Sequence, residues 1–109
     1  MYEYKANVIE VYDGDTVTLD IDLGCHVWIR REKCRLFGIN TPEVRGPKRP
    51  KGLIARDALR AEILGKDITI CTHKDKSGKY GRLLVDIYLE EQHINKWLVD
   101  NNFAEERTY

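Results

Sequence analysis

The chain has 109 residues, 33% of them charged and 42% hydrophobic, which suits one folded domain over residues 1–109 rather than a disordered chain. No apolar run approaches the roughly 20 residues that a membrane-spanning helix needs, so we expect no membrane partner. The formal net charge is zero, so the chain as a whole has no electrostatic field that would attract a polyanion. Any attraction to a polyanion must therefore come from local clusters of charge.

Alternating apolar and polar residues predict three strands in the first third of the chain. Residues 4–12 and 16–21 alternate on either side of an Asp-Gly dipeptide, which favours a tight turn. A Leu-Gly dipeptide at 23–24 predicts a second turn. Residues 26–37 are rich in apolar and aromatic side chains and predict a long third strand. The charged run inside that strand predicts a bulge or an exposed bend.

The rest of the chain predicts two helices and two further strands. Gly and Pro make residues 44–52 a loop, and apolar residues at helical spacing predict a helix over 53–64. The elements expected after it are a strand, a polar loop, a strand and a helix, at 67–72, 74–81, 82–89 and 93–102. Three strands, a helix, two strands and a helix indicate an α+β fold, mainly β. That order is compatible with a five-stranded barrel.

The run Asp-Gly-Asp-Thr at 13–16 places a carboxylate directly after a turn. An ordinary hairpin turn explains this run equally well. The functional interpretation is that Asp15 lies where an extended chain projects its side chain to one face, while Asp13 shapes the turn. Hard cations such as Ca²⁺ favour carboxylates together with backbone carbonyls.

The run 34–43 combines an apolar strand with an abrupt polar corner. A strand that ends at a proline turn is the simpler interpretation, since Thr41-Pro42 favours an extended residue before the proline. However, Arg35 interrupts a firmly apolar strand, and a guanidinium can bind phosphate through two parallel hydrogen bonds. Glu43 follows on the rigid corner, where a carboxylate can act as a general base.

Two loops concentrate the basic residues, although the net charge is zero. The first contains Arg45, Lys48, Arg49 and Lys51, and the second contains Lys74, Lys76, Lys79 and Arg82. Runs of charge are usually only solvated loops. Because two basic loops that flank one acidic corner would surround it with positive charge, they also favour phosphate binding.

The segments 13–16, 34–43 and 79–82, in this order, resemble the staphylococcal nuclease family, and the resemblance extends over residues 8–104. It implies a five-stranded OB-fold barrel with two helices. The hairpin between 20 and 35 is several residues longer than is usual in the family. The family's third C-terminal helix is expected to be absent.

The resemblance also implies a role for individual residues. The implied catalytic residues are Arg35, Glu43 and Arg82. The implied Ca²⁺ ligands are Asp15, Asn40 and the backbone carbonyl of Thr41. The implied substrate-binding residues are Lys79, Tyr80, Lys48, Arg49 and Lys51. Many members of the family have Asp where this chain has Asn40, so we expect a weaker calcium site.

The function expected from these residues is a Ca²⁺-dependent nuclease. It would hydrolyse DNA or RNA, preferably single-stranded or flexible, with low sequence specificity and 3′-phosphate products, and act as a monomer. The first alternative is a catalytically inactive module that binds nucleic acid or protein. The second is an OB-fold oligonucleotide binder without metal. Both catalytic arginines and the glutamate are present, which favours the enzyme.

The remaining residues that could carry chemistry suggest no second site. The three histidines are scattered, so we expect structural or solvated roles. Trp28 is expected to pack in the barrel, with exposed base stacking as the alternative, and Trp97 is expected in the core. The N-terminus has no apolar signal segment and the three cysteines lack zinc-ligand spacing. We therefore expect an intracellular protein with reduced, buried or half-buried thiols.

Overall fold

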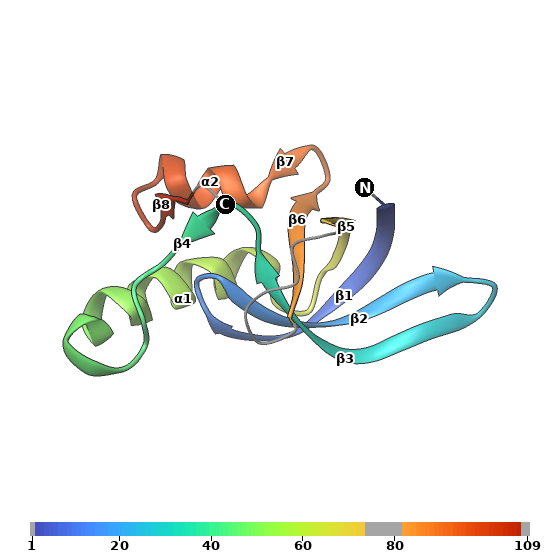
Figure 1. Cartoon of the computed structure of the whole chain (residues 1–109), viewed down its shortest axis with the longest axis horizontal. Helices are drawn as coiled ribbons and strands as arrows, with labels where there is room; N and C mark the ends of the chain where they lie inside the picture. The colour runs from blue at the N-terminus through green and yellow to red at the C-terminus, as the bar shows by residue number, and fades with distance from the viewer. Residues whose placement is uncertain (1, 74–81, 108–109) are drawn as a thin grey trace.

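The computed structural model describes residues 2–73 and 82–107, and its longest strands form a barrel (Figure 1). The strands are β1 (Tyr2–Asp13), β2 (Thr16–Gly24), β3 (Val27–Leu36), β4 (Ile39–Asn40), β5 (Asp67–Thr72), β6 (Leu83–Leu89), β7 (Gln92–His93) and β8 (Glu105–Glu106). The helices are a 3₁₀ turn η1 (Gly46–Lys48), α1 (Arg49–Ile63) and α2 (Ile94–Asp100).

Five strands close the barrel. The sheet has the order β3-β2-β1-β5-β6 with antiparallel neighbours, and β7 extends it beyond β6. A parallel pairing of β3 with β6, in which Cys34 lies opposite Leu83, joins the two ends of the sheet. This closure confirms the five-stranded OB-fold barrel with two α-helices in the described part of the chain. A separate pair, β4 with β8, lies outside the barrel.

The core is formed by the inward-facing residues of the strands and by one face of each helix. On α1, Ala55, Leu59 and Ile63 recur at intervals of one turn and are buried, which explains why this segment folds as an amphipathic helix. Ile94 and Leu98 bury the corresponding face of α2. No helix among the described residues is long and apolar enough to cross a membrane.

Two predicted boundaries were wrong. The second turn is formed by Cys25 and His26, with φ of 54° and 64°, and not by the Leu-Gly dipeptide before them. Two consecutive residues in the left-handed region match the right-handed twist of the flanking strands. Helix α1 begins at Arg49, four residues earlier than expected, because Pro50 lies in the first turn, where its missing N–H costs nothing.

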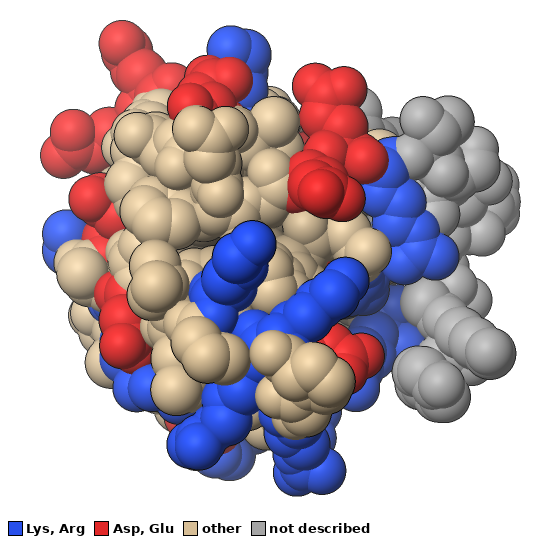
Figure 2. Space-filling view, turned by 90° about the vertical axis from the view of Figure 1, so that its left-hand side faces the viewer, with Lys and Arg blue, Asp and Glu red and all other residues tan. Residues whose placement is uncertain are grey.

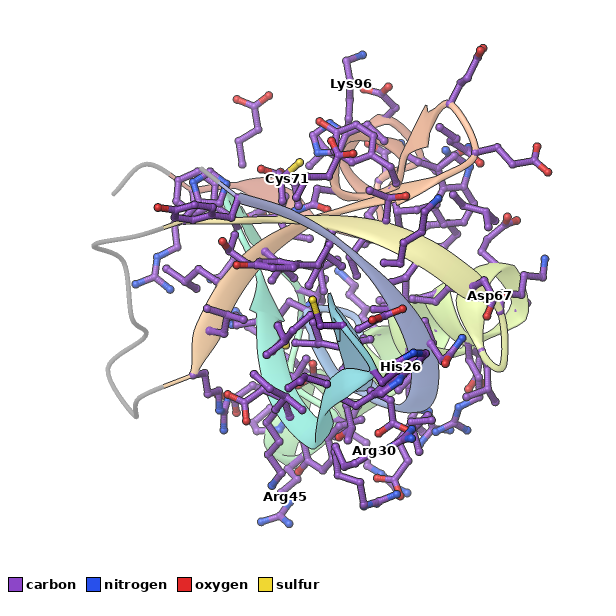
Figure 3. All side chains as sticks on the ribbon, turned by 90° about the vertical axis from the view of Figure 1, so that its right-hand side faces the viewer. His26, Arg30, Arg45, Asp67, Cys71 and Lys96 are labelled. Carbon is purple, nitrogen blue, oxygen red and sulfur yellow. The ribbon has the colours of Figure 1, made fainter. Side chains whose placement is uncertain are left out.

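The outer half of the β2–β3 hairpin projects from the barrel (Figure 1), and Figure 3 looks onto its tip, where His26 and Arg30 are labelled. The predicted bulge is present in β3, where Arg31 has a φ of 53° and the pairing register shifts. Trp28 is 37% exposed beneath the guanidinium of Arg30, 4.6 Å from the ring centre, so its expected packing in the barrel was wrong. Cys25 is exposed at the tip, contrary to the expected burial. Trp97 packs against the core as expected.

Candidate active site at the β1–β2 turn

The turn between β1 and β2 is held by its own first residue. The side chain of Asp13 accepts a hydrogen bond from the backbone N–H of Asp15 through Oδ1, at 3.0 Å, as expected for a residue that shapes the turn. A Cβ on Gly14 would lie 2.7 Å from the Thr41 side chain, so only glycine fits against that segment. The turn is therefore pressed against the corner that follows β4.

A buried ion pair links this turn to β3. Arg35 Nη1 lies 3.0 Å from Asp15 Oδ2, with side chains that are 15% and 6% exposed. The backbone supports the pair, because Thr16 lies opposite Arg35 in the β2–β3 register and Leu36 N donates to the Asp15 carbonyl at 2.8 Å. A buried charge pair of this kind depends on its surrounding hydrogen bonds to offset the cost of removing both charges from water.

The corner after β4 completes this arrangement. Arg35 Nη2 donates to the side-chain oxygen of Asn40 at 2.7 Å and to the Ile39 carbonyl at 3.2 Å. The backbone N–H of Thr41 donates to Asp15 Oδ2 at 3.1 Å. The structure thus brings together Arg35, Asp15, Asn40 and Thr41, four of the residues that the sequence indicated, and we call these four the corner cluster.

The neighbouring carboxyl groups influence each other. Burial, together with the adjacent carboxylate of Asp15, raises the pKa of Asp13 from 3.8 to about 7. Asp15 differs from Asp13 in lying against a guanidinium. Asp15 therefore has a guanidinium beside its carboxylate, whereas burial disfavours the charged form of Asp13.

Glu43 lies two residues beyond the corner cluster, on the surface. Its backbone is held by α1, since a Cβ on Gly52 would lie 2.0 Å from the Glu43 carbonyl oxygen. The helix thus approaches the corner so closely that only glycine can occupy this position. The Glu43 backbone therefore packs closely against α1, while its side chain is exposed to solvent.

The remaining predicted residues lie around the cluster. Arg82 immediately precedes β6, which runs beside β3, and it is half-buried and engaged in an interaction. Lys48, Arg49 and Lys51 are exposed around the start of α1, where Figure 2 shows blue side chains over the lower half of that face. The predictions for Lys79 and Tyr80 lie outside the described residues.

The donor atoms of the cluster suit a hard cation. They comprise the Asp15 carboxylate, the Asn40 side-chain oxygen and the Thr41 carbonyl, all oxygen donors of the type that Ca²⁺ prefers. The Thr41 hydroxyl adds a buried oxygen without a hydrogen-bond partner among the described residues. No group of three or more His, Cys, Asp or Glu within those residues could hold a metal ion, so the carboxylate count is low. Arg35 already contacts two of these oxygens and would compete with a cation for them.

One polar cluster was not predicted from the sequence. Asp86 accepts contacts from His73 Nε2 at 2.5 Å and from His93 Nε2 at 2.8 Å, one on each carboxylate oxygen. Phe37 stacks on His73 with ring centres 3.6 Å apart. The two histidines are 20 positions apart in the sequence. Only the pairing of β5, β6 and β7 shows that they meet, so spacing alone gave no signal.

The comparison with protein families decides the relationship. Residues 33–109 match the model described as "Staphylococcal nuclease homologue", which covers more than half of the chain. The chain belongs to the staphylococcal nuclease family. The matched region includes Arg35, Asn40, Thr41, Glu43 and Arg82. It begins after the β1–β2 turn, so Asp15 enters the site through the geometry rather than through this match.

Curated relatives extend the similarity to the whole chain. A thermonuclease of Staphylococcus hyicus is 27% identical over 110 residues, covering 98% of this chain and 62% of the relative. A thermonuclease of Staphylococcus intermedius is 28% identical over 105 residues, covering 94% of this chain and 59% of the relative. An uncharacterized protein of Bacillus anthracis is 26% identical over 104 residues, covering 92% of this chain and 46% of the relative. The chain thus spans about 60% of the length of the two thermonucleases.

Proposed function

We propose that this member of the staphylococcal nuclease family is a Ca²⁺-dependent nuclease that hydrolyses single-stranded or flexible DNA or RNA with low sequence specificity. The observation that carries the proposal is the corner cluster, in which a guanidinium and several oxygen donors converge at the end of an otherwise apolar strand. Phosphodiester hydrolysis needs positive charge at the phosphate and a carboxylate near the attacking water. The cluster and Glu43 together supply these groups.

Asp15, Asn40 and the Thr41 carbonyl would hold the cation. A bound Ca²⁺ supplies positive charge that polarises a phosphate oxygen. The single carboxylate among these ligands supports weaker binding than a site with two, because calcium affinity depends on the charge of the ligands.

Arg35 and Arg82 would bind the non-bridging phosphate oxygens. A phosphate oxygen can take the place of the Asn40 side-chain oxygen at Arg35 Nη2, which exchanges one hydrogen bond for a charge-assisted one. As water attacks, negative charge grows on these oxygens, so both guanidiniums stabilise the transition state more than the ground state. Contacts to phosphate carry no base information, which supports low sequence specificity.

Glu43 would accept the proton of the attacking water. The oxygen of that water forms a bond to phosphorus, the bond from phosphorus to the 5′-oxygen breaks, and the leaving oxygen takes a proton from solvent. The products are a 3′-phosphate and a 5′-hydroxyl. The exposed carboxylate on a fixed backbone supports this role, since a water molecule can reach it without any movement of the barrel.

The direct test compares cleavage of single-stranded DNA and RNA in Ca²⁺ and in EDTA, using Glu43→Gln beside the wild type. We expect cleavage by the wild type in Ca²⁺ alone, and a loss of about 10²–10⁴ in rate for Glu43→Gln with unchanged substrate binding. Glu91→Gln, which neutralises another exposed carboxylate, is the control and should keep the full rate. Binding without cleavage by the wild type would instead identify an inactive binding module.

A further inference from the structure

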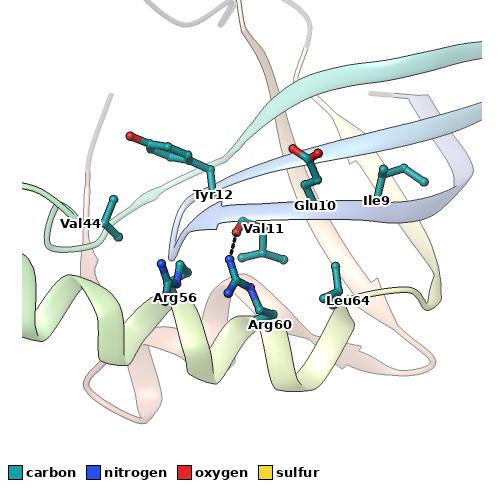
Figure 4. Close-up of a pocket in the computed structure, with 8 residues that line it drawn as sticks. All are labelled: Ile9, Glu10, Val11, Tyr12, Val44, Arg56, Arg60 and Leu64. Atoms are coloured by element: carbon teal, nitrogen blue, oxygen red, sulfur yellow. Dashed lines mark hydrogen bonds between the residues drawn. The ribbon is translucent and has the colours of Figure 1, made fainter.

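An open groove lies between the end of β1 and helix α1, on the chain segments next to the corner cluster (Figure 4). It has a volume of about 430 Å³, and its lining includes Tyr12, Val44, Arg56 and Arg60. Tyr12 directly precedes Asp13, and Val44 directly follows Glu43. The groove therefore shares two stretches of chain with the proposed active site, although it does not include the corner cluster itself.

The helical wall of the groove is basic. Arg56 and Arg60 are one turn apart on α1, so both face the end of β1, and Arg49 lies on the same face two turns earlier. Arg60 Nη2 donates to the Val11 carbonyl at 2.8 Å, which fixes its guanidinium in the groove. Between residues 44 and 60 there are six basic residues against one acidic residue, Asp57. This segment is thus strongly cationic in a chain of zero net charge.

Two acidic side chains reduce this charge only in part. Glu10 lines the groove but lies 2.7 Å from Arg31 Nη2 in a surface ion pair, so its charge is partly offset. Asp57 contacts Arg56 at 3.0 Å and is itself 62% exposed, so an anion could compete for this surface pair. The guanidiniums of Arg56 and Arg60 therefore remain the dominant charges facing the groove.

The opposite wall carries an aromatic side chain with no role in the core. Tyr12 is 51% exposed, while its strand neighbour Val11 is buried. Figure 4 shows the Tyr12 ring at the edge of the groove, extending away from the helix that carries Arg56 and Arg60. Exposed rings together with cations are the combination by which proteins bind single-stranded nucleic acid, with bases stacked on the ring and phosphates on the cations. The groove is large enough for one nucleotide, since small-molecule sites begin at about 300 Å³.

We propose that this groove is a second contact site for single-stranded nucleic acid. It would seat the part of the strand that flanks the scissile phosphodiester, with phosphate oxygens on Arg56 and Arg60 and a base on the Tyr12 ring. The inference rests on the proposed nuclease function for its choice of ligand. It adds a binding site that a short substrate would not reach.

The test measures binding in EDTA by fluorescence anisotropy, with labelled oligothymidylate of about a dozen nucleotides and of about three. Tyr12→Ala should weaken binding of the long strand about tenfold, because stacking contributes about 1–3 kcal/mol per base. Arg56→Gln should also weaken it and reduce its salt dependence by about one phosphate contact. Neither variant should change binding of the short strand.

Two variants serve as controls. Tyr12→Phe keeps the ring and should bind the long strand like the wild type. Lys96→Gln removes an exposed positive charge on α2, far from the groove in sequence, and should bind almost normally. If Tyr12→Ala and Arg56→Gln leave the long strand unaffected, or weaken both strands equally, the groove is not a separate site. Binding of poly-glutamate as tight as that of the long strand would also overturn the proposal.

The outcome is separable from that of the proposed function. Cleavage of the short strand by the wild type in Ca²⁺ reports the nuclease centre alone. If the wild type cleaves while the groove variants bind the long strand normally, only the groove proposal fails. If the wild type cleaves nothing while those variants still bind the long strand more weakly, the nuclease proposal fails and the proposal of a binding groove is supported.

Discussion

The two ends of the β2–β3 hairpin are built from the same pair of strands but differ in what surrounds them. At the inner end, Asp15 is buried and Arg35 is half-buried, and the two are paired and bonded to the corner after β4. At the outer end, Leu23, Val27 and Ile29 are 40–51% exposed around an exposed turn. Both ends contain arginines in ion pairs, so the presence of charge does not distinguish a site from a surface. What distinguishes the inner end is that its charged and polar side chains are more buried and converge on one another.

The largest expected effect is on stability at the inner end. Arg35→Ala leaves Asp15 buried without its cation, which should lower the free energy of unfolding by about 3–5 kcal/mol. Arg30→Ala, on the same strand, removes a side chain that is 63% exposed from a surface pair with Asp20. It should cost less than about 1 kcal/mol. Urea unfolding in EDTA measures the free energy of unfolding of both variants. Equal losses of stability in the two variants would contradict the difference expected between the two ends of the hairpin.

The next prediction concerns Asp13 and its raised pKa in the absence of calcium. Between pH 3.8, its ordinary pKa, and about 7, the folded chain retains a proton that the unfolded chain has released. The contribution of Asp13 to the free energy of unfolding is therefore full below the ordinary pKa and falls as the pH rises through this window. The full shift corresponds to about 4 kcal/mol, and the partial exposure of Asp13 to solvent reduces the expected effect to about 2–3 kcal/mol.

Asp13→Asn should remove this slope and make the calcium-free protein more stable than the wild type at pH 8. The amide retains an oxygen for the Asp15 N–H, so the turn should still form. Thermal unfolding in EDTA at several pH values measures the effect. Asp22→Asn on the outer half of the hairpin, where the side chain makes a similar turn bond to Gly24, is the control. Parallel pH profiles for Asp13→Asn and the wild type would contradict the prediction.

A smaller effect is expected where α1 meets the corner. Gly52→Ala places a methyl group against the Glu43 carbonyl, so either the helix or the Glu43 backbone must shift. We expect a loss of about 1–3 kcal/mol in stability, as for other overpacked sites. Urea unfolding measures that loss, and cleavage assays should show a reduced rate. Ile54→Ala, at an exposed position of the same helix, is the control. A Gly52→Ala variant with wild-type stability and rate would show that Glu43 does not depend on this contact.

The smallest expected effect is a gain in calcium affinity. Asn40→Asp adds a second carboxylate to the oxygen donors, which should tighten Ca²⁺ binding about tenfold in calorimetric titration. Repulsion between the new carboxylate and Asp15 would by itself make this variant less stable without metal. The 2.7 Å contact between Arg35 and Asn40 offsets that repulsion, because a carboxylate there would pair with the same guanidinium. Unchanged or weaker calcium binding would show that residue 40 does not face the cation.

The order of strands and helices could be predicted from the sequence because the apolar residues follow strand or helix spacing and the elements end at glycines, prolines or polar turns. The closure of the strands into a barrel was expected only from the resemblance to the family. The residues at the inner end of the hairpin could be predicted from the sequence, but the contacts between them could not. Arg35 was expected to face phosphate and Asp15 to face metal, whereas the two contact each other. The guanidinium of Arg35 contacts two of the proposed calcium ligands because the fold brings them together. The spacing of these residues in the chain does not predict that contact.

The outer end shows a different limit. Leu23-Gly24 and Cys25-His26 are adjacent candidate turns, and local preference favours the one with glycine. Gly24 does adopt a positive φ of 84°, but the tightest part of the loop is the next two residues. The pairing register of β2 with β3 determines which of two adjacent dipeptides forms the turn. Likewise, the meeting of His73 and His93 at Asp86 required the pairing of three strands.

We propose that the inner end of the hairpin forms a nuclease centre and that the outer end does not. The most direct measurement is the kcat for cleavage of single-stranded DNA in Ca²⁺ by the wild type, Arg35→Lys and Arg30→Lys. Both variants retain the charge, but only Arg35 contacts Asp15 and Asn40 with the two nitrogens of a planar guanidinium. We predict a loss of about 10²-fold or more for Arg35→Lys and a wild-type rate for Arg30→Lys. Equal rates for all three proteins, or no cleavage by any of them, would contradict the account.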